Sequence, residues 1–199
     1  MKIKLKKKPA ALILSALVIL FVAVTFAFYT STDAVTNRFS GENHPDEEKD
    51  VKIVVNETFE PPPRKDDVPF QKKVQIQNTG NTDCFIRVRL EFSSSEIRDI
   101  SWISNDPDKD NEDAYIPASE FPYSTLPEGW EYRESDGFYY YQQPVPPEGS
   151  TVPLIQWVKT LFSQDPSVEA DRYDIFVYSE AVPAVDANGE SLTYDDAWR

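Results

Sequence analysis

Hydrophobic and polar residues alternate along several stretches of the chain, as they do in β-strands that bury one face. In residues 84–92 one face is apolar and the other is mainly charged; the apolar positions are Cys84, Ile86, Val88, Leu90 and Phe92. This period of two predicts a half-buried strand.

The same alternation predicts further strands elsewhere in the chain, at 51–59, 73–77 and 173–178. Residues 78–83 (Asn-Thr-Gly-Asn-Thr-Asp) favour a turn, so we expect 73–77 and 84–92 to form a hairpin or two neighbouring strands.

A second hairpin is predicted where Trp130 and Tyr132 approach an Asp136-Gly137 turn and residues 138–141 return. Residues 152–162 fit either a strand or a short helix, and Pro153 argues against a central strand. An acidic stretch, 104–122, is expected to be a long loop. Many short strands between turns rich in proline and glycine predict an all-β fold, a sandwich or jelly roll over 51–199.

The amino-terminal segment has the features of an export signal. Lysines crowd positions 2–8, and residues 10–28 are uncharged and nearly all apolar. Thr25 and Ala27 fit the −3 and −1 positions of a signal-peptidase site, so we predict a signal peptide at 1–27, cut between Ala27 and Phe28. The apolar run is also about 28 Å long as a helix, which permits an uncleaved single-pass anchor with the β domain outside.

The polar segment 28–50 between this leader and the first strand is predicted to be a flexible, exposed arm.

The 199-residue chain has a formal charge of −14, and loss of the first 27 residues with their five lysines lowers it to −19. Such acidity argues against binding to nucleic acid or to anionic membrane surfaces.

A single cysteine, Cys84, excludes an intrachain disulfide. Exported small domains commonly rely on several disulfides, so an exported chain without them points toward a Gram-positive bacterium.

Residue chemistry predicts no catalytic site. Cys84 lies mid-strand on an apolar face, where thiols are usually inert, and the one histidine, His44, lies in the arm. No zinc-peptidase motif is present, and we predict no cofactor.

The acidic loop contains a weak calcium candidate. Asp106, Asp108 and Asp110 match the first three ligand positions of an EF-hand loop. Asn111 stands where that loop needs glycine and Pro117 where it needs glutamate, so a solvated acidic loop is the favoured interpretation.

One cluster of aromatic residues has the composition of a sugar-stacking surface: Trp130, Tyr132, Phe138, Tyr139, Tyr140 and Tyr141. Cross-strand packing explains such clusters more often.

The order of several motifs resembles the TasA/camelysin group of biofilm matrix proteins, whose leaders are cut by a dedicated SipW-type signal peptidase. The family pattern has a small residue, an aromatic, Thr-Asp, Asn-x-Phe and then a strand ending near a glutamate. Here these are Ala27, Phe28, Thr32, Asp33, Asn37, Phe39 and Glu57. The glycine after Asn-x-Phe, Gly41, stands one residue earlier than in the family pattern.

Later segments resemble the same family. Residues 72–92 look like its strand-turn-strand, and 137–154 and 175–184 look like the later strands of the BsaA-type members, although Pro183 stands where we expect glutamine.

The resemblance implies a jelly-roll or Ig-like sandwich, cleavage near Ala27, and a secreted structural protein of the extracellular matrix that polymerises with itself. Its expected partners are further copies of itself, other matrix proteins, and the signal peptidase during export. Alternatives are a membrane-anchored surface binding or adhesin domain and, less favoured, a camelysin-like peptidase.

Removal of the leader is the first testable prediction. We expect mass spectrometry of the extracellular fraction to find a chain beginning at Phe28, because Thr25 and Ala27 suit the peptidase. An intact chain found only in the membrane fraction would support the anchored alternative instead.

Overall fold

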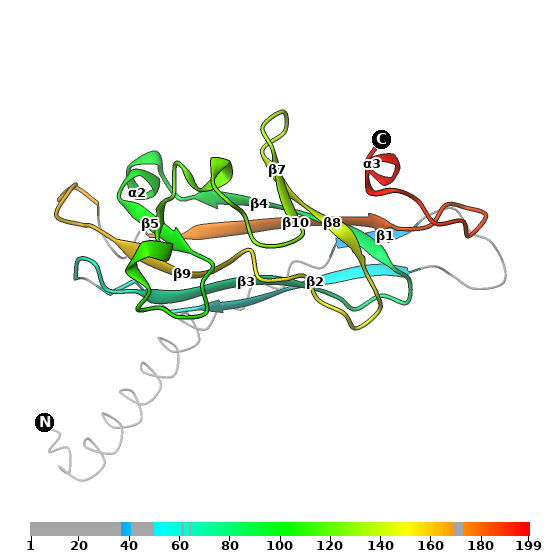
Figure 1. The fold of residues 1–199 in the computed structure, drawn as a ribbon, viewed down its shortest axis with the longest axis horizontal. Helices are drawn as coiled ribbons and strands as arrows, with labels where there is room; N and C mark the ends of the chain where they lie inside the picture. The colour runs from blue at the N-terminus through cyan, green and yellow to red at the C-terminus, as the bar shows by residue number, and fades with distance from the viewer. Residues whose placement is uncertain (1–36, 41–49, 61, 64, 169–172) are drawn as a thin grey trace, which may run out of the picture. The chain divides into compact units, whose positions relative to one another are not determined.

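The computed structural model describes residues 37–40, 50–60, 62–63, 65–168 and 173–199 (Figure 1), which belong to a compact unit spanning Asp33–Arg199. Several predicted features lie outside the described residues: Ala27, Phe28, Thr32, Asp33 and His44. Within the described ranges, no helix is long and apolar enough to cross a membrane.

Two antiparallel sheets make up the fold (Figure 1), which confirms the all-β prediction. Sheet A has six strands in the order β1 (Asn37–Ser40), β2 (Asp50–Phe59), β3 (Phe70–Asn78), β9 (Ile155–Thr160), β5 (Ser101–Ser104) and β6 (Ile116–Pro117). Sheet B has four strands in the order β10 (Ile175–Pro183), β4 (Cys84–Phe92), β8 (Phe138–Val145) and β7 (Trp130–Arg133).

The helices among the described residues are short and lie between or after strands. They are α2 (Ser95–Asp99), the 3₁₀ turns η1 (Glu112–Ala114) and η2 (Phe121–Tyr123), and α3 (Tyr194–Ala197). Part of the predicted acidic loop 104–122 is therefore ordered as η1, β6 and η2.

One hydrophobic core joins the inward faces of both sheets. Sheet A contributes Val51, Ile53, Val55, Val74, Ile76, Ile155 and Val158, and sheet B contributes Cys84, Ile86, Val88, Tyr139, Tyr141, Ile175 and Ala181. These positions recur at every second residue in β2, β3 and β4, because successive side chains of a strand point to opposite faces.

The predicted pairing of β3 with β4 is wrong. β3 pairs with β2 and β9 in sheet A, whereas β4 pairs with β10 and β8 in sheet B. The chain between them, residues 78–83, crosses from one sheet to the other. Its apolar flanking strands can then face each other across the core rather than lie side by side.

Hydrogen bonds explain why this turn does not close a hairpin. The side-chain amide of Asn78 donates to the carbonyl oxygens of Thr82 (2.8 Å) and Val145 (2.9 Å), so it ties the crossing to sheet B. The N–H groups of Thr79 and Gly80 donate to the carbonyl of Lys52, at 2.8 and 3.2 Å. The turn is therefore anchored on β2 and β8.

The other predicted strands are confirmed. β7 and β8 form the second hairpin, with Gly137 at its turn in a left-handed conformation (φ 75°). The ambiguous stretch 152–162 forms the strand β9, in a central position between β3 and β5. Pro153 precedes that strand and so removes none of its ladder hydrogen bonds.

The segment expected as an arm contributes a strand of its own. β1 pairs antiparallel with the start of β2, with Arg38 opposite Lys52 and Ser40 opposite Asp50. It forms the outermost strand of sheet A.

Substitution of Gly80 tests the crossing between the sheets. A Cβ at this position would overlap the carbonyl oxygen of Asp50 and lie 2.8 Å from the nitrogen of Lys52, so the backbone must shift. We expect Gly80→Ala to lower the free energy of unfolding by about 2–3 kcal/mol, measured by urea denaturation with tryptophan fluorescence.

Gly189→Ala is the matched control. Gly189 has φ +85° but nothing within 4 Å of an added Cβ, so only backbone strain of about 1 kcal/mol is expected. Equal losses for the two variants would contradict the close approach of the crossing to β2.

Candidate binding face on sheet B

The outward face of sheet B carries arginine, aromatic and acidic side chains. In β4 the residues between the buried positions are Arg87, Arg89 and Glu91, and in β10 they are Phe176, Tyr178 and Glu180. The period of two that buries one face of each strand places these side chains together on the other face.

Strand register fixes which of these side chains are neighbours. Phe176 lies opposite Glu91, Tyr178 opposite Arg89, and Glu180 opposite Arg87. Two of these pairs therefore set a ring against a charge, and the third sets two opposite charges against each other.

Arginines and aromatic rings stack in two groups on this face. The guanidinium carbon of Arg87 lies 4.2 Å from the ring centroid of Phe138 and 4.6 Å from that of Trp198, and Arg89 lies 4.4 Å from Phe138. In the second group, Arg133 lies 4.3 Å from Tyr140 and 4.7 Å from Tyr194. Each distance is within the range of a cation–π interaction.

Arg87 forms hydrogen bonds with Glu180 and Tyr140. Its Nε donates to Oε2 of Glu180 at 2.7 Å, and its Nη1 donates to the hydroxyl of Tyr140 at 2.8 Å. Burial acts to lower the pKa of Arg87, but these hydrogen bonds raise it overall.

Asp136, at the β7–β8 turn, completes this network. It accepts the Tyr140 hydroxyl (2.6 Å) and the Phe138 N–H (3.2 Å). Burial acts to raise the pKa of Asp136, and these hydrogen bonds together with Arg87 lower it overall. Arg87 thus stays charged and fixed in place.

The carboxyl-terminal segment covers one end of the face. The Tyr194 hydroxyl donates to Glu131 at 2.5 Å, Arg133 forms an ion pair with Asp195 at 2.7 Å, and the Trp198 ring packs edge-on against Tyr140 at 5.5 Å. The Thr193 side chain accepts the Asp196 N–H and begins α3.

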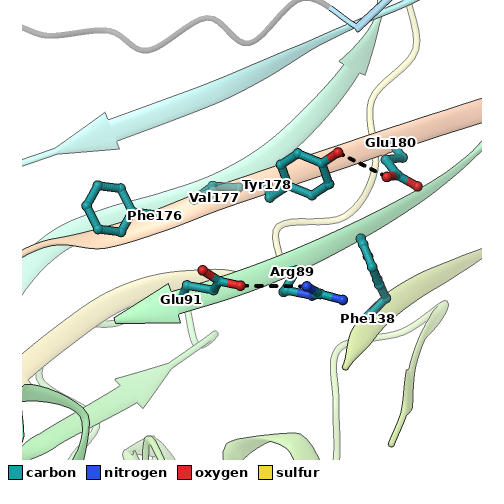
Figure 2. Close-up of a pocket in the computed structure, with 7 residues that line it drawn as sticks. All are labelled: Arg89, Glu91, Phe138, Phe176, Val177, Tyr178 and Glu180. Carbon is teal, nitrogen blue, oxygen red and sulfur yellow. Dashed lines mark hydrogen bonds and ion pairs between the residues drawn. The ribbon is translucent and has the colours of Figure 1, made fainter. Parts of the chain in front are cut away.

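A shallow groove of about 460 Å³ remains at the other end, as Figure 2 shows. Its lining includes Arg89, Glu91, Phe138, Phe176, Tyr178 and Glu180. The rings of Phe176 and Tyr178 project from β10 and are 52% and 46% exposed. The Tyr178 hydroxyl donates to Glu180 at 3.1 Å, and Arg89 donates to the carbonyl oxygen of Asp136 at 2.6 Å.

Such a groove offers stacking surfaces with hydrogen-bonding groups beside them, which suits binding rather than bond-breaking chemistry. One hydroxyl in its lining, that of Tyr178, lies beside a carboxylate, but its hydrogen bond to Glu180 raises the pKa of Tyr178 rather than activating it. No histidine is among the residues that line the groove.

Cys84 lies in the core and away from this face. It is fully buried, and burial, helped by the charge of Asp83, raises the pKa of its thiol to about 12. The thiol is therefore protonated at neutral pH, in agreement with an inert core residue.

Two aspartates of the weak calcium candidate accept backbone N–H groups of their own loop, and Asp110 pairs with Lys109. Asp106 accepts the N–H of Asp108 (2.7 Å), and Asp108 accepts that of Asp110 (3.0 Å). Across the part of the chain that the structure describes, no group of three or more His, Cys, Asp or Glu side chains is arranged to hold a metal ion.

The aromatic cluster of β7 and β8 packs across strands. Trp130 lies 5.1 Å from Tyr141 and Tyr132 lies 5.0 Å from Tyr139, measured between ring centroids. Phe138 and the three tyrosines that follow it are all buried, so the exposed rings of sheet B are Phe176 and Tyr178 of β10. Asn37 and Phe39 of the resemblance motif fall in β1.

Sequence reasoning missed the arginine–aromatic stacks. The alternating arginines of 84–92 and the tyrosines of 138–141 are visible in the sequence as possible stacking partners. Tyr194 and Trp198 are far along the chain, and only the fold brings their rings to this cluster.

No protein-family model, curated protein or solved structure matches this chain.

Arg87→Lys tests the stacking on this face. Lysine keeps the charge but loses the planar group that stacks between Phe138 and Trp198, so we expect a loss of about 1–2 kcal/mol in the free energy of unfolding, measured by urea denaturation.

The control is Arg98→Lys on α2, where the arginine is exposed and paired with its neighbour Asp99. This change should stay within about 0.5 kcal/mol of the unsubstituted protein. A similarly small effect at Arg87 would show that the stacks contribute little.

Proposed function

We propose that this protein is a secreted structural component of a bacterial extracellular matrix, and that it polymerises through its amino-terminal segment. The observation that carries the proposal is β1. The segment that follows the predicted leader already serves as an edge strand, Asn37–Ser40, on β2.

An edge strand of this kind can pair in two ways. The register that joins β1 to β2 within one chain, Arg38 opposite Lys52, is equally available between β1 of one subunit and β2 of the next. Main-chain hydrogen bonds supply the affinity in both cases. A head-to-tail exchange does not close on itself and therefore builds a filament.

Other features support an extracellular structural role. The described domain is a disulfide-free β protein with an extended core, its one cysteine is buried, and the chain is strongly acidic. We propose that its two sheets form a jelly-roll or Ig-like sandwich, that residues 1–27 are removed during export, and that the protein is not an enzyme.

The groove on sheet B favours one alternative. Exposed Phe176 and Tyr178 beside Arg89 are suited to ligand binding, as expected of a cell-surface binding or adhesin domain held in the membrane by an uncleaved leader.

Cysteine cross-linking between different chains tests the polymer. One preparation carries Arg38→Cys and a second carries Lys52→Cys, and the two are mixed under mild oxidation. Residues directly opposite in an antiparallel pair lie about 4.5–5.5 Å apart at Cα, within reach of a disulfide. We expect disulfide-linked dimers in the mixture, read on non-reducing gels, because only exchange of β1 between chains brings the two cysteines together.

Arg98→Cys in place of Lys52→Cys is the control, since Arg98 is exposed on α2. Removal of residues 28–45 should also abolish filaments in electron micrographs. Equal cross-linking in the control, or undiminished filaments after the deletion, would refute assembly through β1.

A further inference from the structure

A buried lysine lies between two carboxylates on sheet A, away from the groove. Lys159 of β9 has a side chain that is only 8% exposed, and its Nζ lies 2.8 Å from Oδ1 of Asp67. It also contacts the carboxylate of Glu112 in η1 and lies 4.5 Å from the ring centroid of Tyr115. Three segments distant in the sequence thus meet at one amine.

The backbone holds Asp67 against this lysine. Asp67 has φ +59°, a left-handed conformation that is uncommon outside glycine, and its N–H donates to the carbonyl of Thr160 at 3.1 Å. The neighbouring Asp66 accepts the N–H of Ser163 at 3.0 Å. The chain is therefore held at Asp67 and at the residue before it, next to the carboxylate that faces Lys159.

We propose that Lys159 and Asp67 become joined by an intramolecular isopeptide bond, with Glu112 as the group that transfers the proton. Nζ of Lys159 attacks Cγ of Asp67, a nitrogen–carbon bond forms, and one carboxyl oxygen leaves as water. Glu112 takes a proton from the amine and delivers it to the leaving oxygen, so it ends in its starting state. An ammonium and a carboxylate give an amide and one water, and no other reactant is needed.

The closeness of the reacting groups raises the rate of the reaction. Groups held in near-attack geometry, with reacting atoms about 3–3.5 Å apart, react with effective molarities of roughly 10⁵ M or more. A contact of 2.8 Å between Nζ and Oδ1 places the amine next to the carboxyl carbon.

The protonation state of Lys159 limits the rate at which the bond forms. Burial acts to lower the pKa of Lys159, but its hydrogen bonds to Asp67 and Glu112 raise it overall. Lys159 is thus mainly in its charged form, and the neutral amine required for attack is a small fraction. We therefore expect the bond to form slowly after folding. The side chains of Asp67 and Glu112 are 56% and 62% exposed, so the released water can leave to the solvent.

Lys72 provides an internal comparison. It is fully buried on the core face of β3, lies 4.6 Å from the ring centroid of Phe59, and forms an ion pair with one carboxylate, that of Glu57. No second carboxylate contacts it among the described residues. Without a group to transfer the proton, we expect Lys72 to remain a free amine.

Tryptic peptide mapping of the purified full chain tests the proposal. Without a link, cleavage after lysine and arginine should release residues 66–72, with Asp67, separately from 134–159, which ends at Lys159. We expect 66–72 joined to 134–172, with no cut after Lys159 and with the mass of one water missing, in most molecules.

Variants identify the role of each group, with the fold of each checked by circular dichroism. Lys159→Arg and Asp67→Ala should give no linked peptide. Asp67→Asn should give the same linked peptide, with ammonia lost instead of water. Glu112→Gln should slow its formation at least about tenfold, because general acid–base catalysis is removed.

Two results would overturn the inference. One is complete cleavage after Lys159 together with free 66–72 in folded, aged protein. The other is a link from Lys159 to residues 110–133, which contain Glu112, because that would exchange the roles of the two carboxylates.

Discussion

Burial of the facing apolar sides of two sheets is the interaction on which the rest of the molecule depends. The chain has a single cysteine, which lies in the core as a free thiol, so no disulfide shares the task. Residues from β2 and β3 meet residues from β4, β8 and β10 in one cluster. Because apolar burial is the dominant favourable term in folding, this cluster decides how the strands are arranged.

That constraint leaves the outward positions of each strand available for other uses. On sheet B they hold arginines stacked between aromatic rings, with α3 over one end and a groove at the other. On sheet A, the side chain of Lys159 on the central strand β9 contacts Asp67, Glu112 and Tyr115. Both clusters combine charges with aromatic rings, which lets buried cations keep favourable contacts.

The edges of the sheets connect this fold to the proposed matrix role. β1 lies at one edge of sheet A and β6 at the other, and β10 and β7 are the edges of sheet B. An edge strand supplied by a segment near the amino terminus is the simplest device for linking identical subunits, because the pairing needs backbone groups and little side-chain specificity. Covalent closure of the Lys159 site would tie Asp67 to β9 within each subunit, and does not depend on assembly.

The sequence by itself determined several of the strands and the face that each of these buries, because the period of two in segments such as 84–92 and 173–178 is a local property of the chain. It did not determine β1, β6 or β9. It also determined that Cys84 is a core residue rather than a reactive thiol. Only the tertiary structure decided that β3 and β4 belong to different sheets, since alternation reports which face is buried and not which strand lies beside it. The same limit hid the meeting of Arg87 with Trp198 and of Lys159 with Asp67, because each pair is separated by a long stretch of chain that folding closes.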